Sequence, residues 1–404
     1  MKKFGTVVLA AALAATSLTG CSEGGNDKVE NTSANNGTVT TTEDTASPNG
    51  ETSYTASAKN VKMLGRTAYL DDDVLYCAFS GTGIEFTFTG TKCSITVVGD
   101  SGSTNSGNAD SQARVGIYVD GERVIDDMVD QAEEVYNVID SDAEVTATVS
   151  LVKLSETANS IMGIKEIKVV GSEIKPTANK DLLIEFVGDS ITCGYGVDDP
   201  DKDHHFSTKT EDITKAYGYK TAQKMDADYS MVSLSGYGII SGYSGDGKKV
   251  PAQTLPQYYD KLGYSWNVCG SFSPSAVEWD FSKRQPDLIV ITLGTNDDRY
   301  TKDNQELQEE YSAAYTEFIK QVREKNPDAK ILCALGVMGD TLYPYVEKAV
   351  ERYAEETGDK DSVFAVKLSP QSASNGYAAD WHPSEATHEA TAKAVVREIK
   401  KILG

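Results

Sequence analysis

Leu182-Leu183-Ile184-Glu185-Phe186-Val187-Gly188-Asp189-Ser190 is the stretch that decides the fold of the C-terminal half of the chain. Its first six residues are mostly apolar, which predicts a strand buried on both faces of a sheet, and polar residues begin where this strand ends. Further apolar runs follow, with helical stretches between them, and they cover residues 229–234, 288–293, 331–335 and 363–366. Apolar strands that alternate with helices predict an α/β domain with a doubly wound parallel sheet over residues 180–404.

Apolar periodicity also predicts two of the helices in this half. One covers residues 304–325, and the other follows Pro383. His388 lies on the second of these helices, and we expect its side chain on the surface. The expected apolar stripe of that helix consists of Ala390, Ala394, Val395, Ile399 and Leu403.

Residues 59–174 have a different pattern, in which short β-rich runs alternate with turns of Gly, Asp and Ser. Residues 83–89 alternate between apolar and polar, and the run 113–119 leads into Asp120-Gly121, a typical hairpin turn. The remaining runs are 94–98, 145–151 and 164–170. Many short strands with frequent turns predict a β-sandwich of the jelly-roll type in front of the α/β domain.

The N-terminal segment predicts export. An apolar run over residues 7–18 follows two lysines and is too short to span a bilayer, so residues 1–20 are expected to be a secretory signal peptide. Leu18-Thr19-Gly20-Cys21 resembles the bacterial lipobox, in which Cys21 carries the lipid anchor of an extracellular, cell-surface lipoprotein. The alternative is an ordinary signal peptide whose cysteine has no role. Residues 21–58 are rich in Ser, Thr, Asn and Gly and are expected to form a flexible tether.

The charge of the chain limits its partners. Lys and Arg number 38 and Asp and Glu number 61, so the formal net charge is −23 at pH 7. Such a chain repels phosphate backbones and anionic lipid head groups. Nucleic acid is therefore excluded as an expected partner, and a neutral substrate is favoured.

The cysteines and histidines form no metal-binding pattern. Beyond Cys21 the cysteines are odd in number and lack paired C-x-x-C spacing, so most are expected to be buried small apolar residues. His204 and His205 stand in an acidic loop, where solvated side chains are a better interpretation than a metal site. No metal ion and no organic cofactor is predicted.

Polar or glycine-rich residues follow each of the first three predicted strands of the α/β domain. These blocks are Gly188-Asp189-Ser190, Ser235-Gly236-Tyr237-Gly238 and Gly294-Thr295-Asn296-Asp297. A fourth block, Asp380-Trp381-His382-Pro383, precedes the last helix. Because ligands on a parallel sheet bind beyond the carboxyl ends of its strands, these blocks are expected to form one site.

The residue types in these blocks suit acyl transfer. Ser190 supplies a hydroxyl nucleophile, and His382 supplies the base that takes its proton. The oxyanion that forms needs fixed donors, and the candidates are the backbone N–H groups of Ser190 and Gly236 and the side-chain amide of Asn296. Gly238 is an alternative to Gly236. Each of these residues also has a purely structural interpretation, as a strand-end cap, a tight turn or a brace.

The four blocks, in this order, resemble those of the SGNH, or GDSL, hydrolases over roughly residues 182–403. The longer motif from Gly188 to Gly196, together with Thr210-Glu211-Asp212, looks like carbohydrate esterase family two in particular. Members of that family join an N-terminal jelly roll to an SGNH domain. The resemblance implies an acetyl esterase of the acetylxylan esterase type, whose partner is acetylated plant cell-wall polysaccharide such as xylan or glucomannan.

The resemblance also bears on the partners of His382. SGNH enzymes usually place an acid three residues before the histidine, but Ala379 holds that position here and Asp380 comes two residues before. Asp380 is expected to complete the catalytic set, with a backbone carbonyl as the alternative. Trp381 is expected to bind substrate, with core packing as the alternative.

The remaining expectations concern the oligomeric state, the role of the β domain and two rival functions. The chain is expected to act as a monomer, and the β domain is expected to support the site rather than to bind carbohydrate. One rival function keeps the chemistry but acts on lipid esters or peptidoglycan O-acetyl groups. A second rival is a non-catalytic, surface-displayed glycan-binding lipoprotein.

Overall fold

The strand that opens the C-terminal half is β12 (Leu183–Gly188), in a computed structural model that describes residues 45–46, 50–105, 107 and 109–404. It belongs to a five-stranded sheet with the order β13-β12-β14-β15-β16, in which every pairing is parallel. The other strands are β13 (Asp228–Ser233), β14 (Leu288–Thr292), β15 (Lys330–Leu335) and β16 (Val363–Lys367). The predicted α/β fold is confirmed. Because the strand order reverses at β12 and β14, a crevice is expected beyond their carboxyl ends.

Helices alternate with these strands. The α-helices are α1 (Ser190–Cys193), α2 (Tyr217–Lys224), α3 (Thr295–Thr301), α4 (Gln305–Lys325), α5 (Tyr343–Thr357) and α6 (Glu385–Leu403). The 3₁₀ turns cover Thr208–Thr210, Ile213–Lys215, Leu255–Gln257, Pro274–Ala276, Ala373–Asn375 and Ala379–Trp381. Asn304 caps α4, because its side-chain oxygen accepts the N–H groups of Glu306 and Leu307. Both predicted helices are therefore present.

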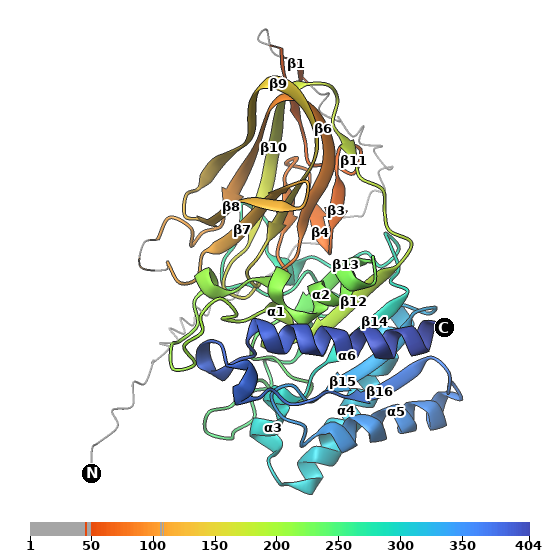
Figure 1. Cartoon of the computed structure of the whole chain (residues 1–404). Coiled ribbons are helices and arrows are strands. Elements are labelled where there is room, and N and C mark those ends of the chain that lie inside the picture. Colours follow the sequence, from red (N-terminus) through yellow and green to blue (C-terminus); the bar gives the residue numbers. More distant parts are fainter. Residues whose placement is uncertain (1–44, 47–49, 106, 108) are drawn as a thin grey trace, which may run out of the picture. The chain divides into compact units, whose positions relative to one another are not determined.

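Both faces of the parallel sheet are covered. Ile184 and Phe186 of β12 lie in a core with residues of α2 and α6, whereas Val187 lies in a second core with residues of α4 and α5. Figure 1 shows α6 on one side of the sheet and α4 and α5 on the other. Neighbouring strand residues point to opposite faces, so a strand covered on both faces must be apolar nearly throughout.

The apolar stripe predicted for α6 is confirmed at Val395 and Ile399, which are buried. It is wrong at Ala390 and Leu403, which are exposed, and His388, expected on the surface, is buried. His388 Nδ1 accepts the backbone N–H of Tyr217 at 3.2 Å, where α2 begins without a side-chain cap of its own. Burial lowers the pKa of His388 to about 3, so the ring is neutral. The buried face of α6 consists of Thr387, His388, Thr391, Ala392, Val395 and Ile399.

The N-terminal domain is one antiparallel sheet of eleven strands. They are β1 (Thr45–Ala46), β2 (Glu51–Tyr54), β3 (Lys62–Leu64), β4 (Thr67–Tyr69), β5 (Leu75–Cys77), β6 (Gly83–Gly99), β7 (Ala113–Val119), β8 (Glu122–Val129), β9 (Glu133–Lys153), β10 (Met162–Gly171) and β11 (Lys175–Pro176). The predicted antiparallel β domain is confirmed, although hydrogen bonds join its strands into one continuous sheet. The predicted runs 83–89 and 94–98 form the single strand β6, because the expected turn near Gly90 is a register shift against β9. The sheet encloses one core that includes Phe86, Phe88, Ile95 and Val97.

Two details of this domain bear on the sequence predictions. Asp120 and Gly121 join β7 to β8 with φ of 52° and 84°, which confirms the hairpin turn. The tether predicted for residues 21–58 is wrong at its end, because β2 pairs with β10 and Tyr54 is buried. The predicted signal peptide, Cys21 and the first part of the tether lie outside the described residues.

An ion pair inside the protein joins the two domains. Arg66, between β3 and β4, donates from Nε and Nη2 to the carboxylate of Glu185 in β12 at 3.0 and 2.7 Å. Both side chains are buried. Breaking such a pair leaves an uncompensated buried charge, so this contact fastens the β domain to the sheet.

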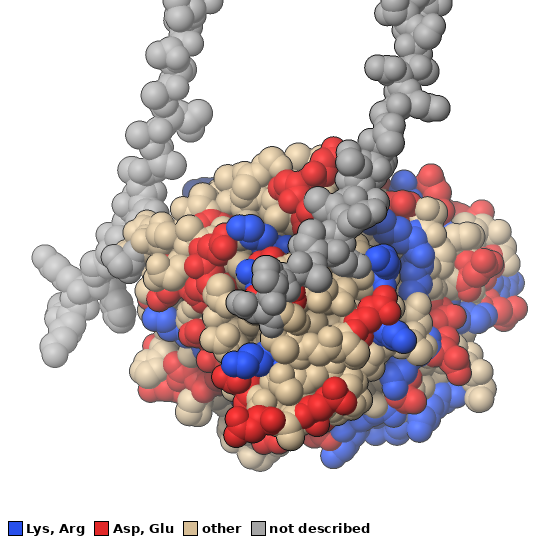
Figure 2. Space-filling view, turned by 90° about the horizontal axis from the view of Figure 1, so that it is seen from above, with Lys and Arg blue, Asp and Glu red and all other residues tan. Residues whose placement is uncertain are grey.

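The structure also shows the state of the cysteines, the distribution of surface charges and the apolarity of the helices. All five described cysteines are free and buried, as expected: Cys77, Cys93, Cys193, Cys269 and Cys333. Figure 2 shows acidic and basic side chains interspersed on the face it displays. Within the described part of the chain, none of the helices has the length and apolarity needed to cross a bilayer.

Candidate active site

Ser190 stands at the first residue of α1, directly beyond the carboxyl end of β12. Asp189 caps this turn, because its Oδ1 accepts the N–H of Ile191 at 3.0 Å. Gly188 allows the tight turn, since a Cβ atom there would lie only 2.0 Å from Thr192 Oγ1. The sharp turn leaves the Ser190 side chain 7% exposed at the edge of the sheet.

His382 reaches the same place from the segment before α6. Its Nε2 lies 2.9 Å from Ser190 Oγ, and its Nδ1 lies 3.2 Å from the carbonyl oxygen of Ala379. A carbonyl can only accept, so Nδ1 carries the proton and Nε2 is free to accept the Ser190 hydroxyl. Burial lowers the pKa of His382 to about 4, which keeps the ring neutral and able to act as a base.

An aromatic stack holds the His382 ring. Tyr195 lies against it with ring centroids 3.8 Å apart, and Phe206 covers the Tyr195 ring at 4.3 Å. Neither residue was assigned a role from the sequence, although Tyr195 belongs to the motif that begins at Gly188. The stack restricts rotation of the imidazole and helps to aim Nε2 at the serine.

The structure corrects the expectation for Asp380. Its carboxylate accepts the Tyr195 hydroxyl at 2.8 Å and the Phe206 N–H at 2.9 Å, and it pairs with His205 Nδ1 at 2.9 Å. Asp380 has a left-handed φ of 50°, and among the described hydrogen bonds its carboxylate makes none to His382. The backbone carbonyl of Ala379 therefore orients the histidine, and Asp380 fixes the aromatic stack beside it.

Two backbone N–H groups are available as oxyanion donors. Among the hydrogen bonds of the described residues, none uses the N–H of Ser190 or of Gly236. The N–H of Gly238 donates to the carbonyl of Gln253 at 3.2 Å, which disfavours Gly238 as the alternative. The role of Gly236 remains a prediction, and its positive φ of 81° is a conformation that suits glycine.

Asn296 lies at the start of α3, beside Asp189 of the serine turn. Its Nδ2 donates to the carbonyl of Tyr237 at 2.8 Å and lies 3.4 Å from Asp189 Oδ2. The second contact is long for a hydrogen bond, so this N–H can turn to a stronger acceptor. An oxyanion is such an acceptor, and the assignment of Asn296 to the oxyanion hole remains a prediction.

Asp297 holds the loop that follows β13. Its buried carboxylate accepts the backbone N–H groups of Ile239, Ile240 and Ser241 at 2.8 to 3.1 Å. Burial raises the pKa of Asp297 to about 6. The block that contains Asn296 thus also ties the loop with Gly236 and Tyr237 to α3.

The aromatic and histidine candidates around the site are exposed. Trp381 is 50% exposed, which excludes core packing, and its ring contacts Tyr377 and the ammonium group of Lys202. His204 and His205 pair with different carboxylates, those of Asp199 and Asp380 respectively, and do not converge on one point. In the described ranges, the cluster of metal-ligand types is instead buried and consists of Glu156, Cys193 and Glu211.

Two family models match this chain in succession. Residues 63–177 match the N-terminal domain of carbohydrate esterase 2, and residues 186–390 match the GDSL-like lipase/acylhydrolase family. The chain is 32% identical over 370 residues to a cellulase/esterase, CelE, of Acetivibrio thermocellus, which covers 88% of this chain and 41% of that protein. It is 24% identical to an acetylxylan esterase/glucomannan deacetylase of Cellvibrio japonicus, over 86% of this chain and 90% of that protein. The chain thus spans about two fifths of the length of CelE.

Solved structures match over both domains. A family two carbohydrate esterase from Clostridium thermocellum in complex with cellohexaose has a TM-score of 0.73 and 29% identity, over 85% of this chain and 99% of that chain. An acetyl xylan esterase, Est2A, from Butyrivibrio proteoclasticus has a TM-score of 0.76 and 25% identity, over 86% and 96% of the two chains. The GDSL-like model covers about half of this sequence, from β12 into α6, and includes both Ser190 and His382. This chain therefore belongs to the GDSL-like lipase/acylhydrolase family.

Proposed function

We propose that this protein is a serine esterase that removes O-acetyl groups from plant cell-wall polysaccharides such as xylan and glucomannan. The observation that carries the proposal is the contact of 2.9 Å between Ser190 Oγ and His382 Nε2, with Nδ1 of the same ring on the Ala379 carbonyl. The substrate class is inferred from relatives named as acetylxylan esterases and a glucomannan deacetylase.

The reaction follows from the positions of these groups. His382 takes the proton of Ser190 as the serine oxygen attacks the acetyl carbonyl. The oxyanion accepts hydrogen bonds from the Ser190 and Gly236 N–H groups and from Asn296. The bond between the acetyl carbon and the sugar oxygen then breaks, His382 gives the proton to that oxygen, the sugar leaves as an alcohol, and the acetyl group stays on Ser190. Water, activated by His382, hydrolyses this acetyl-enzyme.

The catalytic groups in this scheme are all residues of this chain. His382 is neutral before reaction, and the imidazolium that forms donates to the Ala379 carbonyl. The exposed Trp381 ring can stack on a sugar of the polymer, because an aromatic face offers a large apolar contact. No step requires a metal ion or an organic cofactor.

Acetate release from a panel of substrates tests the proposal. We expect release from acetylated xylan and acetylated glucomannan, and faster hydrolysis of p-nitrophenyl acetate than of long-chain p-nitrophenyl esters. Preference for the long-chain esters, or for acetylated peptidoglycan, would replace the substrate assignment and keep the chemistry. Polysaccharide binding without release of acetate would instead support the non-catalytic glycan-binding function.

We also propose that the protein is exported and anchored to the cell surface through a lipid on Cys21. The support is the basic start, the short apolar run and the Leu-Thr-Gly-Cys sequence. Fractionation of expressing cells tests this, because Cys21→Ala should move the protein from the membrane fraction to a soluble one. Unchanged membrane association of Cys21→Ala would contradict the lipid anchor.

A further inference from the structure

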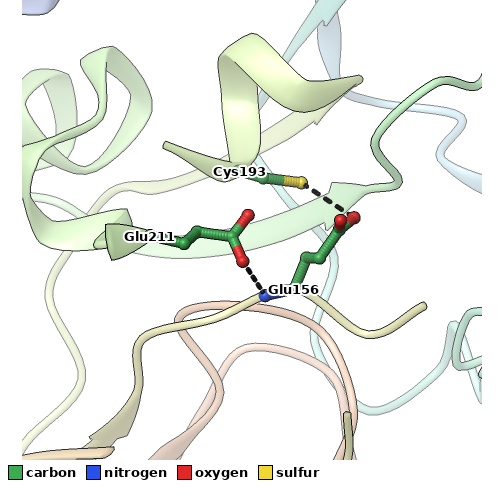
Figure 3. A group of neighbouring side chains, drawn as sticks. All are labelled: Glu156, Cys193 and Glu211. Atoms are coloured by element: carbon green, nitrogen blue, oxygen red, sulfur yellow. Dashed lines mark hydrogen bonds between the residues drawn. The ribbon is translucent and has the colours of Figure 1, made fainter. Parts of the chain in front are cut away.

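A carboxylate from the β domain reaches the loops of the Ser190 site. Glu156 lies in the connection between β9 and β10, and its side chain is 1% exposed. Its Oε2 accepts the backbone N–H of Ser235 at 2.8 Å. The Cys193 thiol lies 3.8 Å from the same oxygen (Figure 3) and 3.2 Å from Ser233 Oγ, so it is shared between these two acceptors. One carboxylate oxygen therefore contacts two separate segments of the hydrolase domain.

These two segments are the ones that present the candidate oxyanion donors. Ser235 directly precedes Gly236, and Cys193 belongs to the single turn of helix that begins at Ser190. A Cβ built at Gly236 would have open space around it, with Tyr243 Cβ at 3.9 Å, and the Gly236 carbonyl accepts the Tyr243 N–H at 2.7 Å. The contact with Glu156 therefore holds the loop immediately next to Gly236.

Glu211 holds Glu156 in place from the hydrolase side. Its Oε2 accepts the backbone N–H of Glu156 at 2.7 Å (Figure 3). Its Oε1 is buried and has no hydrogen-bond partner among the described residues. Burial raises the pKa of Glu211 well above its usual range. Glu211 belongs to the Thr210-Glu211-Asp212 motif, to which the catalytic scheme gives no role.

Lys153 holds the backbone of the connection that carries Glu156. It is fully buried, and its Nζ donates to the carbonyl oxygens of Ser155 and Glu156 at 2.6 and 2.9 Å. Burial lowers the pKa of Lys153 to about 8, and the nearby carboxyl groups of Glu211, Asp100 and Glu156 act in the opposite direction.

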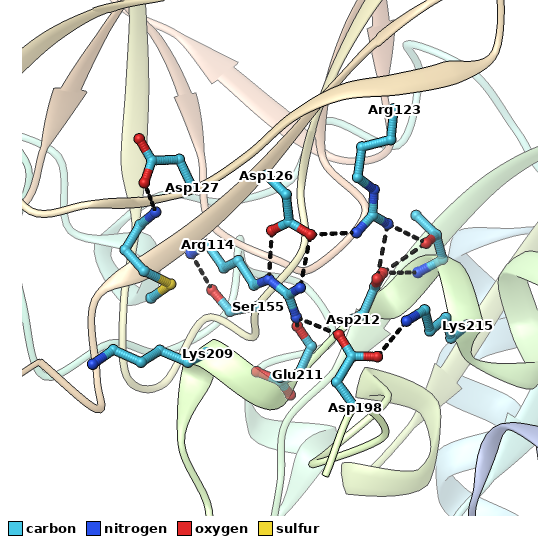
Figure 4. A network of polar contacts seen from close by, with 12 residues as sticks. Arg114, Arg123, Asp126, Asp127, Ser155, Asp198, Lys209, Glu211, Asp212 and Lys215 are labelled. Atoms are coloured by element: carbon cyan, nitrogen blue, oxygen red, sulfur yellow. Dashed lines mark hydrogen bonds and ion pairs between the residues drawn. The ribbon is translucent and has the colours of Figure 1, made fainter.

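Two arginines of the β domain form hydrogen bonds with the connection between β9 and β10 and with the hydrolase segment around Glu211 (Figure 4). Arg114 of β7 donates its backbone N–H to Ser155 Oγ at 3.0 Å and its Nη1 to the Glu211 carbonyl at 3.3 Å. Arg123 of β8 donates to the Asp212 carboxylate at 2.8 Å. The loop that carries Glu156 is thus tied to the hydrolase domain on both sides, which leaves its carboxylate little freedom to leave Ser235.

The hydrogen bonds argue against a metal ion at this cluster. One ligand-type atom each of Glu156, Cys193 and Glu211 lies within 4.8 Å of the others. However, Glu156 Oε2 already accepts the Ser235 N–H, Cys193 Sγ lies 3.2 Å from Ser233 Oγ, and burial raises the pKa of the Cys193 thiol well above its usual range. The Lys153 ammonium donates to two backbone carbonyls of the same connection. A hydrogen-bonded support describes this set of donors and acceptors better than an ion site.

We propose that Glu156 is a positioning residue for the esterase reaction, which fixes the Ser190 and Gly236 N–H groups relative to each other through Cys193 and Ser235. The inference rests on the proposed esterase function. A displacement of about 1 Å at a catalytic group can cost on the order of 100-fold in rate, so the two turns need a common support. The β domain thereby completes the hydrolase site without contacting the substrate.

Two variants of equal length at position 156 test this role in the full-length protein. Glu156→Met fills the same space but removes the acceptor, whereas Glu156→Gln keeps an oxygen that can accept the Ser235 N–H. With p-nitrophenyl acetate we expect Glu156→Met to lower kcat by about 10- to 100-fold while KM changes less than about threefold. Glu156→Gln should keep kcat within about fivefold of the parent protein.

The double variant Arg66→Met with Glu185→Gln is the matched control, because it removes a buried ion pair between the same domains away from both turns. We expect it to lower Tm but to leave kcat within about twofold. A kcat for Glu156→Met within threefold of the parent protein would overturn the proposal. So would equal losses of kcat in Glu156→Met and Glu156→Gln, or a matching loss in the control.

If Glu156→Met does not fold, Glu156→Asp decides the matter. It keeps the charge but is one methylene too short for Ser235, so a kcat within twofold of the parent protein would overturn the proposal, and a loss of about tenfold or more would support it. Failure of the esterase function itself is distinguishable, because the parent protein would then hydrolyse no p-nitrophenyl acetate.

Discussion

The turns that carry Ser190 and His382 are held in different ways. Asp189 is fully buried and caps the serine turn. Glu156 of the β domain contacts Cys193, the last residue of the same turn. The histidine turn contains two residues of positive φ, Asp380 at 50° and Trp381 at 62°. Its only acidic side chain points to an aromatic stack and not to the histidine.

The two kinds of support predict which parts of the site tolerate substitution. The serine turn is set by buried backbone hydrogen bonds, so its geometry follows from the Gly-Asp-Ser sequence and from the strand that precedes it. His382 instead depends on one backbone carbonyl and on ring stacking with Tyr195. Loss of a reactive group in either turn should be severe, but loss of the Asp380 carboxylate should be mild.

The largest effect is expected for the reacting pair. Ser190→Ala and His382→Ala should each lower kcat for p-nitrophenyl acetate by about 10⁴-fold or more, because nucleophile and base act as one unit. Circular dichroism and Tm should match those of the parent protein. Activity of the Ser190→Ala variant close to that of the parent protein would disprove the assignment of the nucleophile.

Asn296, the predicted oxyanion donor at the start of α3, should give the second largest effect. Asn296→Ala should lower kcat by about 100- to 1000-fold, which is the usual loss for one donor. Asn296→Asp is the control, because it keeps the size but places a carboxylate near the oxyanion and should be no more active. A change below threefold in Asn296→Ala would remove this residue from the oxyanion hole.

The pH dependence of activity tests the protonation of His382. The pKa of His382 is lowered to about 4, and its protonated form cannot act as a base, so activity is lost as the pH falls through this value. We expect kcat/KM to stay level from pH 7 to about 5 and to fall about tenfold per unit below about 4. Samples returned to pH 7 should regain activity, which separates titration from acid unfolding. A midpoint between 6 and 7 would indicate that a carboxylate stabilises the imidazolium.

A smaller effect on kcat is expected for Asp380→Asn. A carboxylate that orients a catalytic histidine contributes about 10⁴-fold to kcat. Because the Ala379 carbonyl occupies that place here, Asp380→Asn should lower kcat by less than about fivefold. The Asp380 charge raises the pKa of His382, so the acid limb of the pH profile should move to lower pH in this variant. A loss of 1000-fold or more would restore Asp380 to the catalytic set.

The sequence predicted the parts of the site that local motifs determine. Gly188, Asp189 and Ser190 follow a buried strand, and their turn is fixed within five residues. The doubly wound parallel sheet could also be predicted, since apolar strands alternating with helices allow few arrangements. These predictions required no knowledge of contacts between distant segments.

The remaining features depend on such contacts. The direction of the Asp380 side chain is set by a left-handed backbone residue and by Tyr195, which is 185 positions earlier in the chain. His388 is buried because α2 begins against it, a packing detail that shifts the face of α6. Glu156 comes from another domain, and no spacing pattern connects it to Ser235.

The smallest effect is expected at the exposed end of the histidine turn. Trp381 lies two residues past the Ala379 carbonyl and is half-exposed, so its ring can be removed without moving His382. Trp381→Ala should raise KM for acetylated xylan about threefold by loss of stacking, and Trp381→Phe should recover most of it. Kinetics with p-nitrophenyl acetate should stay within twofold, since that ester has no sugar ring. A large loss with both substrates would mean that Trp381 holds the turn of His382, and the histidine turn would then be as sensitive to change as the serine turn.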